Sequence, residues 1–123
     1  MILGIGTDII EVDRVARAIS QEAFKKKIFS DREIAYCDAQ KRDESYAGRF
    51  AAKEAFFKAL GTGWRDGMGI TEVEILNDHL GKPEIHLSGK ALEVFEQKGG
   101  THIHISISHI KTQAIAFVTL EKL

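Results

Sequence analysis

The pattern of apolar and polar residues predicts one strand and two helices in the first third of the chain. Residues 2–9 form a nearly continuous apolar run that leads into Asp8, which predicts a buried strand. Residues 12–19 place apolar side chains at the i, i+3, i+4 and i+7 positions of an amphipathic helix. Ser30 and Glu33 have the spacing of a capping box, so a second helix is predicted to begin at Ser30.

The longest predicted helix covers residues 45–60. This segment is rich in Ala, Lys, Glu and Phe, and Gly61 follows it as a residue suited to the left-handed conformation that ends many helices. Residues 61–69 are rich in glycine, which predicts a loop.

Strand patterns dominate the rest of the chain. Residues 73–75 alternate apolar and acidic side chains, and residues 85–87 form a short returning strand after a turn at 81–83. Ser88 is placed to cap a further helix over residues 89–98, which keeps apolar side chains on one face.

The last two predicted strands, residues 102–108 and 114–120, form a hairpin with a turn near residues 111–112. The predicted order is strand, three helices, two strands, helix, two strands. Without a regular strand–helix–strand alternation, this order indicates an α+β fold in which a mostly antiparallel sheet packs with the long central helix. No repeat or linker divides the chain, so residues 1–123 are predicted to form a single domain.

The composition excludes several classes of protein. With 44% apolar and 28% charged residues and a formal net charge of −1, the chain has no overall attraction for nucleic acid. Residues 1–8 lack the basic start of a signal peptide, and no apolar run approaches the roughly 20 residues of a membrane span. Cys37 is the only cysteine and is predicted to be a packing residue in a reducing compartment. A cytoplasmic protein that binds neither nucleic acid nor membrane is therefore expected.

Glu54 is the unusual residue of the long predicted helix. On a helical wheel its carboxylate falls in the middle of the apolar face, close to Phe50 and Phe57. A carboxylate on a buried face is costly unless it is paired, bound to a metal or protonated. Lys58, four residues later, offers the simple alternative of an ion pair on the helix surface.

Asp8 is a second carboxylate in an apolar setting. Alone, it would equally serve as a helix N-cap or a turn residue. Two isolated carboxylates, one ending a strand and one in mid-helix, can converge on a hard cation, and Mg²⁺ is commonly held by one or two carboxylates together with waters and phosphates. Asp8 and Glu54 would then be the metal ligands, and Lys58 would meet a phosphate. The pattern therefore favours phosphoryl chemistry.

Other polar patterns carry less chemical information. The glycine-rich segment 61–69 lacks the Gly-Lys-Ser/Thr ending of a Walker A loop. His102 and His104 share one side of a predicted strand, where an exposed polar face is favoured over a zinc site because no third ligand follows at a recognisable spacing. His109 is either a phosphate contact or a turn residue.

Three segments together resemble the holo-(acyl carrier protein) synthase family of small phosphopantetheinyl transferases. Gly4–Glu11 with Arg14 is similar to the N-terminal motif of that family, Arg49–Gly61 to its central helix, and Ser106–His109 to its C-terminal strand motif. The resemblance runs in order along nearly the whole chain.

This resemblance implies an α+β fold and a homotrimer in which each active site is shared across a subunit interface. Asp8 and Glu54 would hold magnesium together with the diphosphate of coenzyme A. Lys58 would contact the diphosphate and steady the departing adenosine 3′,5′-bisphosphate. Arg14 would face the acidic recognition helix of the carrier protein. The segments that line the nucleotide in relatives contain, in this chain, Arg49, Lys82, Pro83 and His109.

The resemblance predicts transfer of the 4′-phosphopantetheine group of coenzyme A to a serine of an apo-acyl carrier protein, in support of fatty acid biosynthesis. The serine proton would be taken by Glu54 or by water on the metal. Two other functions use the same residues. A non-catalytic module would bind an acidic partner through Arg14 and Arg17 and would need no magnesium. A magnesium-dependent phosphohydrolase would release phosphopantetheine without a carrier protein.

Overall fold

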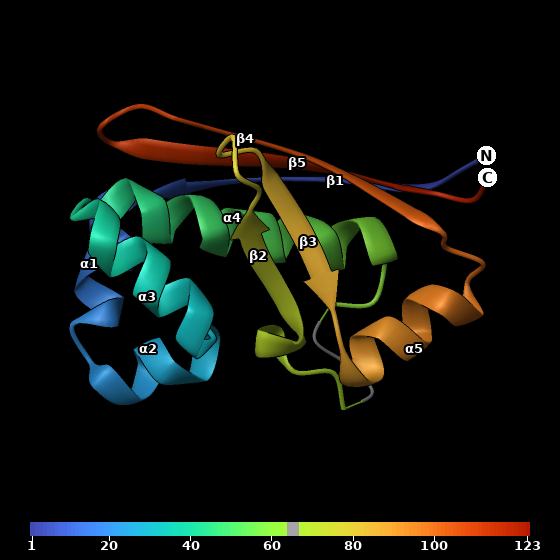
Figure 1. The fold of residues 1–123 in the computed structure, drawn as a ribbon, viewed down its shortest axis with the longest axis horizontal. Helices are drawn as coiled ribbons and strands as arrows, with labels where there is room; N and C mark the ends of the chain where they lie inside the picture. Colours follow the sequence, from blue (N-terminus) through green and yellow to red (C-terminus); the bar gives the residue numbers. More distant parts are fainter. Residues whose placement is uncertain (64–66) are drawn as a thin grey trace.

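The computed structural model describes residues 1–63 and 67–123 (Figure 1). The elements in chain order are β1 (Ile2–Glu11), α1 (Val12–Ile19), α2 (Glu22–Ile28), α3 (Asp31–Gln40), α4 (Asp43–Leu60), the 3₁₀ turn η1 (Ile70–Glu72), β2 (Val73–Asn77), β3 (Pro83–Leu87), α5 (Gly89–Gln97), β4 (His102–His109) and β5 (Gln113–Glu121). No helix among these residues is both long and apolar enough to cross a lipid bilayer.

The strands form two antiparallel sheets. The longer sheet has the order β1-β5-β4, and β2 pairs with β3 in a separate hairpin. Figure 1 shows α4 running along one face of the longer sheet, with the β2–β3 hairpin crossing in front of this helix from the level of β4, and α5 beside the far end of the hairpin. Helices α1, α2 and α3 gather at one end of the molecule, and the two termini lie together at the other. The predicted α+β fold with antiparallel strands and a long central helix is confirmed.

The close contact between β1 and α4 depends on two glycines. A Cβ atom on Gly4 would overlap the carbonyl oxygen of Ala59, and one on Gly6 would overlap that of Ala55. The backbones of strand and helix therefore approach more closely than any side chain on this face of β1 would allow. The neighbouring strand β5 covers the rest of the helix with the buried side chains of Ala114, Ala116, Val118 and Leu120.

A buried ion pair holds the other side of α4. Lys53 and Glu33 are both 0% exposed, and Lys53 Nζ lies 2.8 Å from Glu33 Oε1. Lys53 also donates to the carbonyl oxygens of Val73 (2.6 Å) and Ile70 (3.3 Å), while Glu33 Oε2 accepts from Ile75 N–H at 2.8 Å. These bonds match the three donors of the ammonium group, which is what a charge without solvent requires. They join α3, α4, η1 and β2.

Two local expectations need correction. Helix α2 was not predicted, because residues 22–28 are mostly charged and lack apolar spacing, and no side chain caps the helix at Gln21. Helix α5 is present, but Ser88 makes no side-chain capping bond. The carboxylate of Glu72 accepts from the backbone N–H groups of Lys90 (3.3 Å) and Ala91 (3.1 Å) instead. The capping box at Ser30 and the left-handed stop at Gly61 are confirmed.

The outer face of the longer sheet, which points away from α4, exposes apolar side chains. Ile5, Ile9, Ile115 and Phe117 are between 43% and 60% exposed. They lie on the adjacent strands β1 and β5, so they are neighbours on one surface. A solvated sheet face normally carries polar residues, and contiguous exposed apolar side chains mark surfaces that bind other molecules.

Replacement of Gly6 by alanine should destabilise the protein by about 3 kcal/mol, because the new Cβ would force β1 and α4 apart. Chemical denaturation followed by circular dichroism measures the free energy of unfolding. Gly69→Ala is the control: a Cβ there meets only side-chain atoms of Glu72 and Thr71 at van der Waals distance, so the change should stay below about 1 kcal/mol. Equal stability of Gly6→Ala and the wild type would show that β1 does not need this close approach.

Candidate active site

Asp8 lies on the face of β1 that is turned towards α4. It has the same strand parity as Gly4 and Gly6, and its side chain is only 16% exposed. Lys58 Nζ on α4 donates to Asp8 Oδ1 at 3.0 Å and to the carbonyl oxygen of Thr7 at 3.1 Å. The glycine contact thus brings an acidic residue of the strand into an ion pair with a lysine of the helix.

Glu54 is half-buried on α4, in the same hollow as Asp8. Burial raises the pKa of the Glu54 carboxyl, and the negative charge of Asp8 raises this pKa further, whereas the positive charge of Lys58 lowers it. Lys58 makes its ion pair with Asp8. The alternative prediction, an ion pair between Lys58 and Glu54 on the helix surface, is therefore not what the structure shows. We refer to Asp8, Glu54 and Lys58 as the acid cluster.

The acid cluster has the donors that magnesium prefers. Asp8 and Glu54 offer hard carboxylate oxygens from two different elements, and Lys58 adds a positive charge beside them. In the described part of the chain, no three or more His, Cys, Asp or Glu residues gather as a metal site. Two carboxylates nonetheless suit Mg²⁺, which takes its remaining ligands from water and phosphate oxygens. The residues present therefore fit a magnesium ion bound together with a phosphate-bearing substrate.

The hollow beside the acids continues between α1, α2 and α4. It has a volume of about 460 Å³. Arg14 of α1 stands at its exposed rim, and the apolar side chains of Val15, Phe24 and Phe50 line it. A second molecule that enters this hollow would meet an arginine and an apolar surface next to the acid cluster.

A second cluster surrounds Arg49, which is only 5% exposed. Its guanidinium lies 4.2 Å from the centre of the Tyr36 ring and donates to Asn77 Oδ1 and to the carbonyl oxygen of Ser45. Arg49 Nε is the one buried side-chain nitrogen or oxygen within residues 1–63 and 67–123 that has no hydrogen-bond partner. Pro83 and His109 line the same hollow of about 180 Å³, and we call Arg49, Pro83 and His109 the arginine cluster.

The predicted site residues therefore fall into two groups on one chain. Asp8 lies on β1, and His109 lies on β4; these are the two edge strands of the longer sheet, with β5 between them. The hollows that contain the two clusters share no residue. Lys82 lies next to the arginine cluster, in a neighbouring groove that shares Pro83 with it.

Several residues that shape these clusters were not assigned these roles from the sequence. Lys53 and Glu33 anchor α4, although Glu33 was predicted only as part of the capping box, and Asn77 and Tyr36 hold Arg49. Lys53, like Glu54, is a charged residue in an otherwise apolar helix, and this could have marked it as unusual. Residue spacing along one helix does not reveal partners on other elements, so the pairing of Lys53 with Glu33 could not be predicted. Cys37 is buried, as expected for a packing residue, and burial is the main cause that raises the pKa of its thiol to about 12.

His102 and His104, two of the three histidines of β4, face the outer side of the sheet. His104 Nε2 lies 2.9 Å from Glu121 Oε1, and His102 Nδ1 lies 2.8 Å from the Thr101 hydroxyl. Both side chains are exposed, as predicted for a polar strand face.

Comparisons with known proteins agree on one family. Residues 4–118 match the model of the 4′-phosphopantetheinyl transferase superfamily. The chain is 50% identical over 123 residues to the holo-(acyl-carrier-protein) synthase of Clostridium tetani, with coverage of 98% of this chain and 97% of the relative. The crystal structure of the Neisseria meningitidis holo-(acyl-carrier-protein) synthase has a TM-score of 0.89 and 40% identity, covering 99% of this chain and 100% of that one. That of the Bacillus anthracis synthase in complex with CoA (3′,5′-ADP) has a TM-score of 0.83 and 37% identity, covering 100% and 99%.

Glu54→Gln should leave the protein at least as stable as the wild type at pH 7 in metal-free buffer. The pKa of Glu54 is raised above its ordinary value of 4.5 in the folded chain, so stability from this group is present below pH 4.5 and lost as the pH rises through the raised pKa. Glutamine carries no charge, so the variant does not lose this stability. The difference in unfolding temperature between the variant and the wild type should therefore shrink as the pH falls from 7 to 4, and thermal unfolding at both pH values measures this difference.

Glu96→Gln provides the matched control, since it makes the same change at an exposed position of α5. Its unfolding temperature should follow that of the wild type at both pH values. A Glu54→Gln protein that unfolds at a lower temperature than the wild type at pH 7 would contradict the electrostatic description of the acid cluster.

Proposed function

The chain belongs to the 4′-phosphopantetheinyl transferase superfamily, and from this premise we propose that it transfers the 4′-phosphopantetheine group of coenzyme A to a serine of an apo-acyl carrier protein. This is the reaction of a holo-(acyl-carrier-protein) synthase, and it supplies carrier protein for fatty acid biosynthesis. The observation that carries the proposal is the acid cluster at the contact between β1 and α4. It occurs in a chain that is 50% identical to such a synthase.

Asp8 and Glu54 are the proposed ligands of a magnesium ion, which when bound neutralises negative charge on the diphosphate of coenzyme A. Lys58 Nζ, which donates to Asp8 Oδ1, is proposed to contact the same diphosphate and to stabilise the charge that builds on the bridging oxygen. The serine oxygen attacks the phosphorus that bears the pantetheine arm. The new oxygen–phosphorus bond forms as the bond to the bridging oxygen breaks, and adenosine 3′,5′-bisphosphate leaves.

The serine proton has two acceptors open to it, Glu54 and water. The raised pKa of the Glu54 carboxyl favours the first, because a base works best when its pKa approaches the operating pH. A bound cation would lower that pKa and favour the second. Arg14, at the rim of the same hollow, is the proposed contact for acidic side chains of the carrier protein.

The arginine cluster is proposed to bind the nucleotide end of coenzyme A. The unpartnered Nε of the buried Arg49 supports this role, since a buried N–H without a partner is costly and an anion would satisfy it. His109 and Pro83 open onto the same hollow, and Lys82 stands beside it.

A homotrimer would join the two clusters. In a closed ring, each contact brings two different surfaces of the chain together. The acid cluster lies at the β1 edge of the sheet and the arginine cluster at the β4 edge, so neighbouring copies would complete one site at each interface. The exposed apolar side chains of the outer sheet face supply a surface that such an assembly would bury. We place the enzyme in the cytoplasm, whose reducing conditions suit the buried free thiol of Cys37.

Intact-mass spectrometry of an apo-acyl carrier protein tests the reaction. Incubation with the enzyme, coenzyme A and magnesium should add the mass of one phosphopantetheine group, and EDTA should prevent the addition. Glu54→Gln should reduce the rate by at least about 100-fold without unfolding the protein. Release of free phosphopantetheine without a carrier would favour the phosphohydrolase. A folded enzyme that binds a carrier protein but modifies none would favour the binding module.

Complementation between inactive variants tests the shared site. Glu54→Gln damages the acid cluster and Arg49→Gln the arginine cluster, so each should be inactive alone. When both chains are produced together, about a quarter of the interfaces in random trimers combine an intact acid cluster with an intact arginine cluster, and a similar fraction of wild-type activity should return.

Co-production of Glu54→Gln with Asp8→Asn is the control for that experiment. Both substitutions lie in the acid cluster, so no interface between these chains has two intact halves and activity should not return. Failure of the first pair to regain activity, from variants that still assemble, would place both clusters in the same chain's site.

A further inference from the structure

The ion pair between Lys53 and Glu33 is fully buried, and no step of the proposed reaction uses it. Lys53 directly precedes Glu54 in α4, so a residue anchored in the core and a proposed metal ligand are neighbours in the chain. Replacing a buried ion pair by apolar side chains of similar size often leaves the stability of a protein unchanged or improves it. Stability alone therefore gives little reason for two charges at this position.

The pair covers the edge of β2 that faces away from β3. Alternate residues of an antiparallel strand direct their N–H and C=O groups away from the partner strand. The backbone bond from Ser88 N–H to Glu72 O makes the odd-numbered residues of β2 the ones that do so. At that edge Val73 O accepts from the ammonium group of the pair at 2.6 Å, and Ile75 N–H donates to its carboxylate at 2.8 Å. The two side chains thus take the place of a neighbouring strand.

The ammonium group of Lys53 is held from three directions. Its acceptors, one in each of α3, η1 and β2, are Glu33 Oε1, Ile70 O and Val73 O. These bonds use every donor of the group, so α4 cannot turn about its axis without breaking at least one of them. Glu54 leaves the helix about 100° away from Lys53 and faces the hollow beside Asp8. The rotation of α4 that satisfies Lys53 is therefore the one that turns Glu54 towards Asp8.

The fixed rotation of α4 matters for the chemistry because two carboxylates in one hollow repel each other when both are ionised. A helix that was free to turn would move Glu54 away from Asp8. A cation would then have to use part of its binding energy to bring the two acids together again. An anchored helix keeps the acids side by side before the cation arrives.

We propose that Lys53 is a positioning residue of the acid cluster, an inference that rests on the proposed function. Paired with Glu33, it holds α4 in the rotation at which Asp8 and Glu54 are ready to share a divalent cation. Lys53 acts through the helix, because partners in the core use all the donors of its ammonium group.

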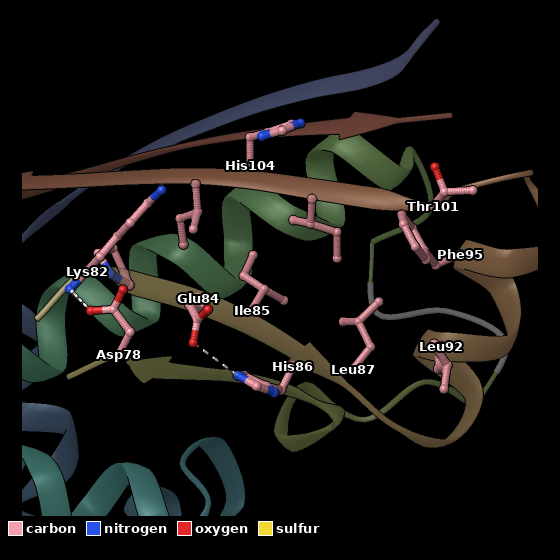
Figure 2. A pocket seen from close by; sticks show the side chains of 13 residues that line it. Asp78, Lys82, Glu84, Ile85, His86, Leu87, Leu92, Phe95, Thr101 and His104 are labelled. Atoms are coloured by element: carbon pink, nitrogen blue, oxygen red, sulfur yellow. Dashed lines mark hydrogen bonds and ion pairs between the residues drawn. The ribbon is translucent and has the colours of Figure 1, made fainter. Parts of the chain in front are cut away.

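The pair also holds the β2–β3 hairpin, which offers a second path to the chemistry. Figure 2 shows Ile85 and Leu87 of β3 pointing into the space beneath β4, with Lys82 at the turn of the same hairpin. A pair that served only to place this hairpin would affect the contacts of the hairpin with coenzyme A and leave the acid cluster unchanged. The first path changes metal binding and kcat, whereas the second changes KM for coenzyme A.

The test cuts the link from α4 while β2 stays attached to α3. Lys53→Met with Glu33→Gln removes both charges, and the amide oxygen at position 33 can still accept from Ile75 N–H. Mn²⁺ is the probe, and electron paramagnetic resonance of free Mn²⁺ measures its dissociation constant with the metal-free protein. Binding of Mn²⁺ should weaken about tenfold. At saturating magnesium, kcat for transfer should fall about tenfold, while KM for coenzyme A stays within about twofold of the wild type.

Arg32→Met is the matched control. Arg32 pairs with Glu74 between the same two elements, α3 and β2, but at an exposed position. Its loss should change Mn²⁺ binding and kcat by less than about twofold. Lys53→Gln with Glu33→Gln is a second variant, which keeps a hydrogen-bond donor at position 53 and is less able to disturb the fold. It should weaken Mn²⁺ binding at least about threefold.

Circular dichroism establishes that each variant is folded. Folded variants that bind Mn²⁺ as the wild type does would overturn the proposal and leave the pair a structural role only. A raised KM for coenzyme A with unchanged Mn²⁺ binding would assign the pair to the hairpin and overturn the proposal as well, as would a wild type that binds no Mn²⁺. Failure of the proposed function would differ, because the wild type would then transfer no phosphopantetheine to any carrier, whereas Mn²⁺ binding requires no transfer.

Discussion

The contact between β1 and α4 is the constraint on which the site depends. Gly4 and Gly6 allow the strand backbone to lie directly against the carbonyl groups of Ala59 and Ala55. The absence of side chains at these two positions sets the distance between the two elements, and the next inward-facing residue of the strand is Asp8. Its ion pair with Lys58 and its effect on the pKa of Glu54 both follow from that distance. Residues 4–8 of β1 therefore both pack the strand against the helix and carry the carboxylate of the site.

A second anchor fixes the opposite side of α4. Lys53 and Glu54 are consecutive, so their side chains leave the helix about 100° apart. Lys53 enters the core to meet Glu33 and two carbonyl groups of the β2 region, whereas Glu54 faces the hollow beside Asp8. A buried ion pair contributes little net stability compared with apolar packing, but it penalises every arrangement that leaves one partner unpaired. It fixes how β2 lies against α4, and β2 carries the Asn77 side chain that holds Arg49.

The sequence predicts those features that depend on neighbouring residues. The capping box at Ser30, the stop at Gly61 and the terminal hairpin are each encoded within a few residues, and the structure has all three. Helix α2 lacked such a local signal. The cap of α5 came from Glu72, a residue distant from the predicted Ser88. The division of the strands into two sheets was likewise not predicted, because alternation identifies a strand but not its partner.

Recognition of the site by motif has a similar limit. The motifs name Asp8, Glu54 and Lys58 on one side and Arg49, Pro83 and His109 on the other, and the structure gathers each set but separates the two. The separation has a topological cause: the sets lie at β1 and β4, the two open edges of a three-stranded sheet. Open edges expose unpaired backbone groups and are normally protected in stable proteins. If copies of the chain meet edge to edge around the apolar outer face, one assembly step covers both edges of the sheet. The same step completes the site, so catalysis and protection of the sheet edges would both depend on assembly.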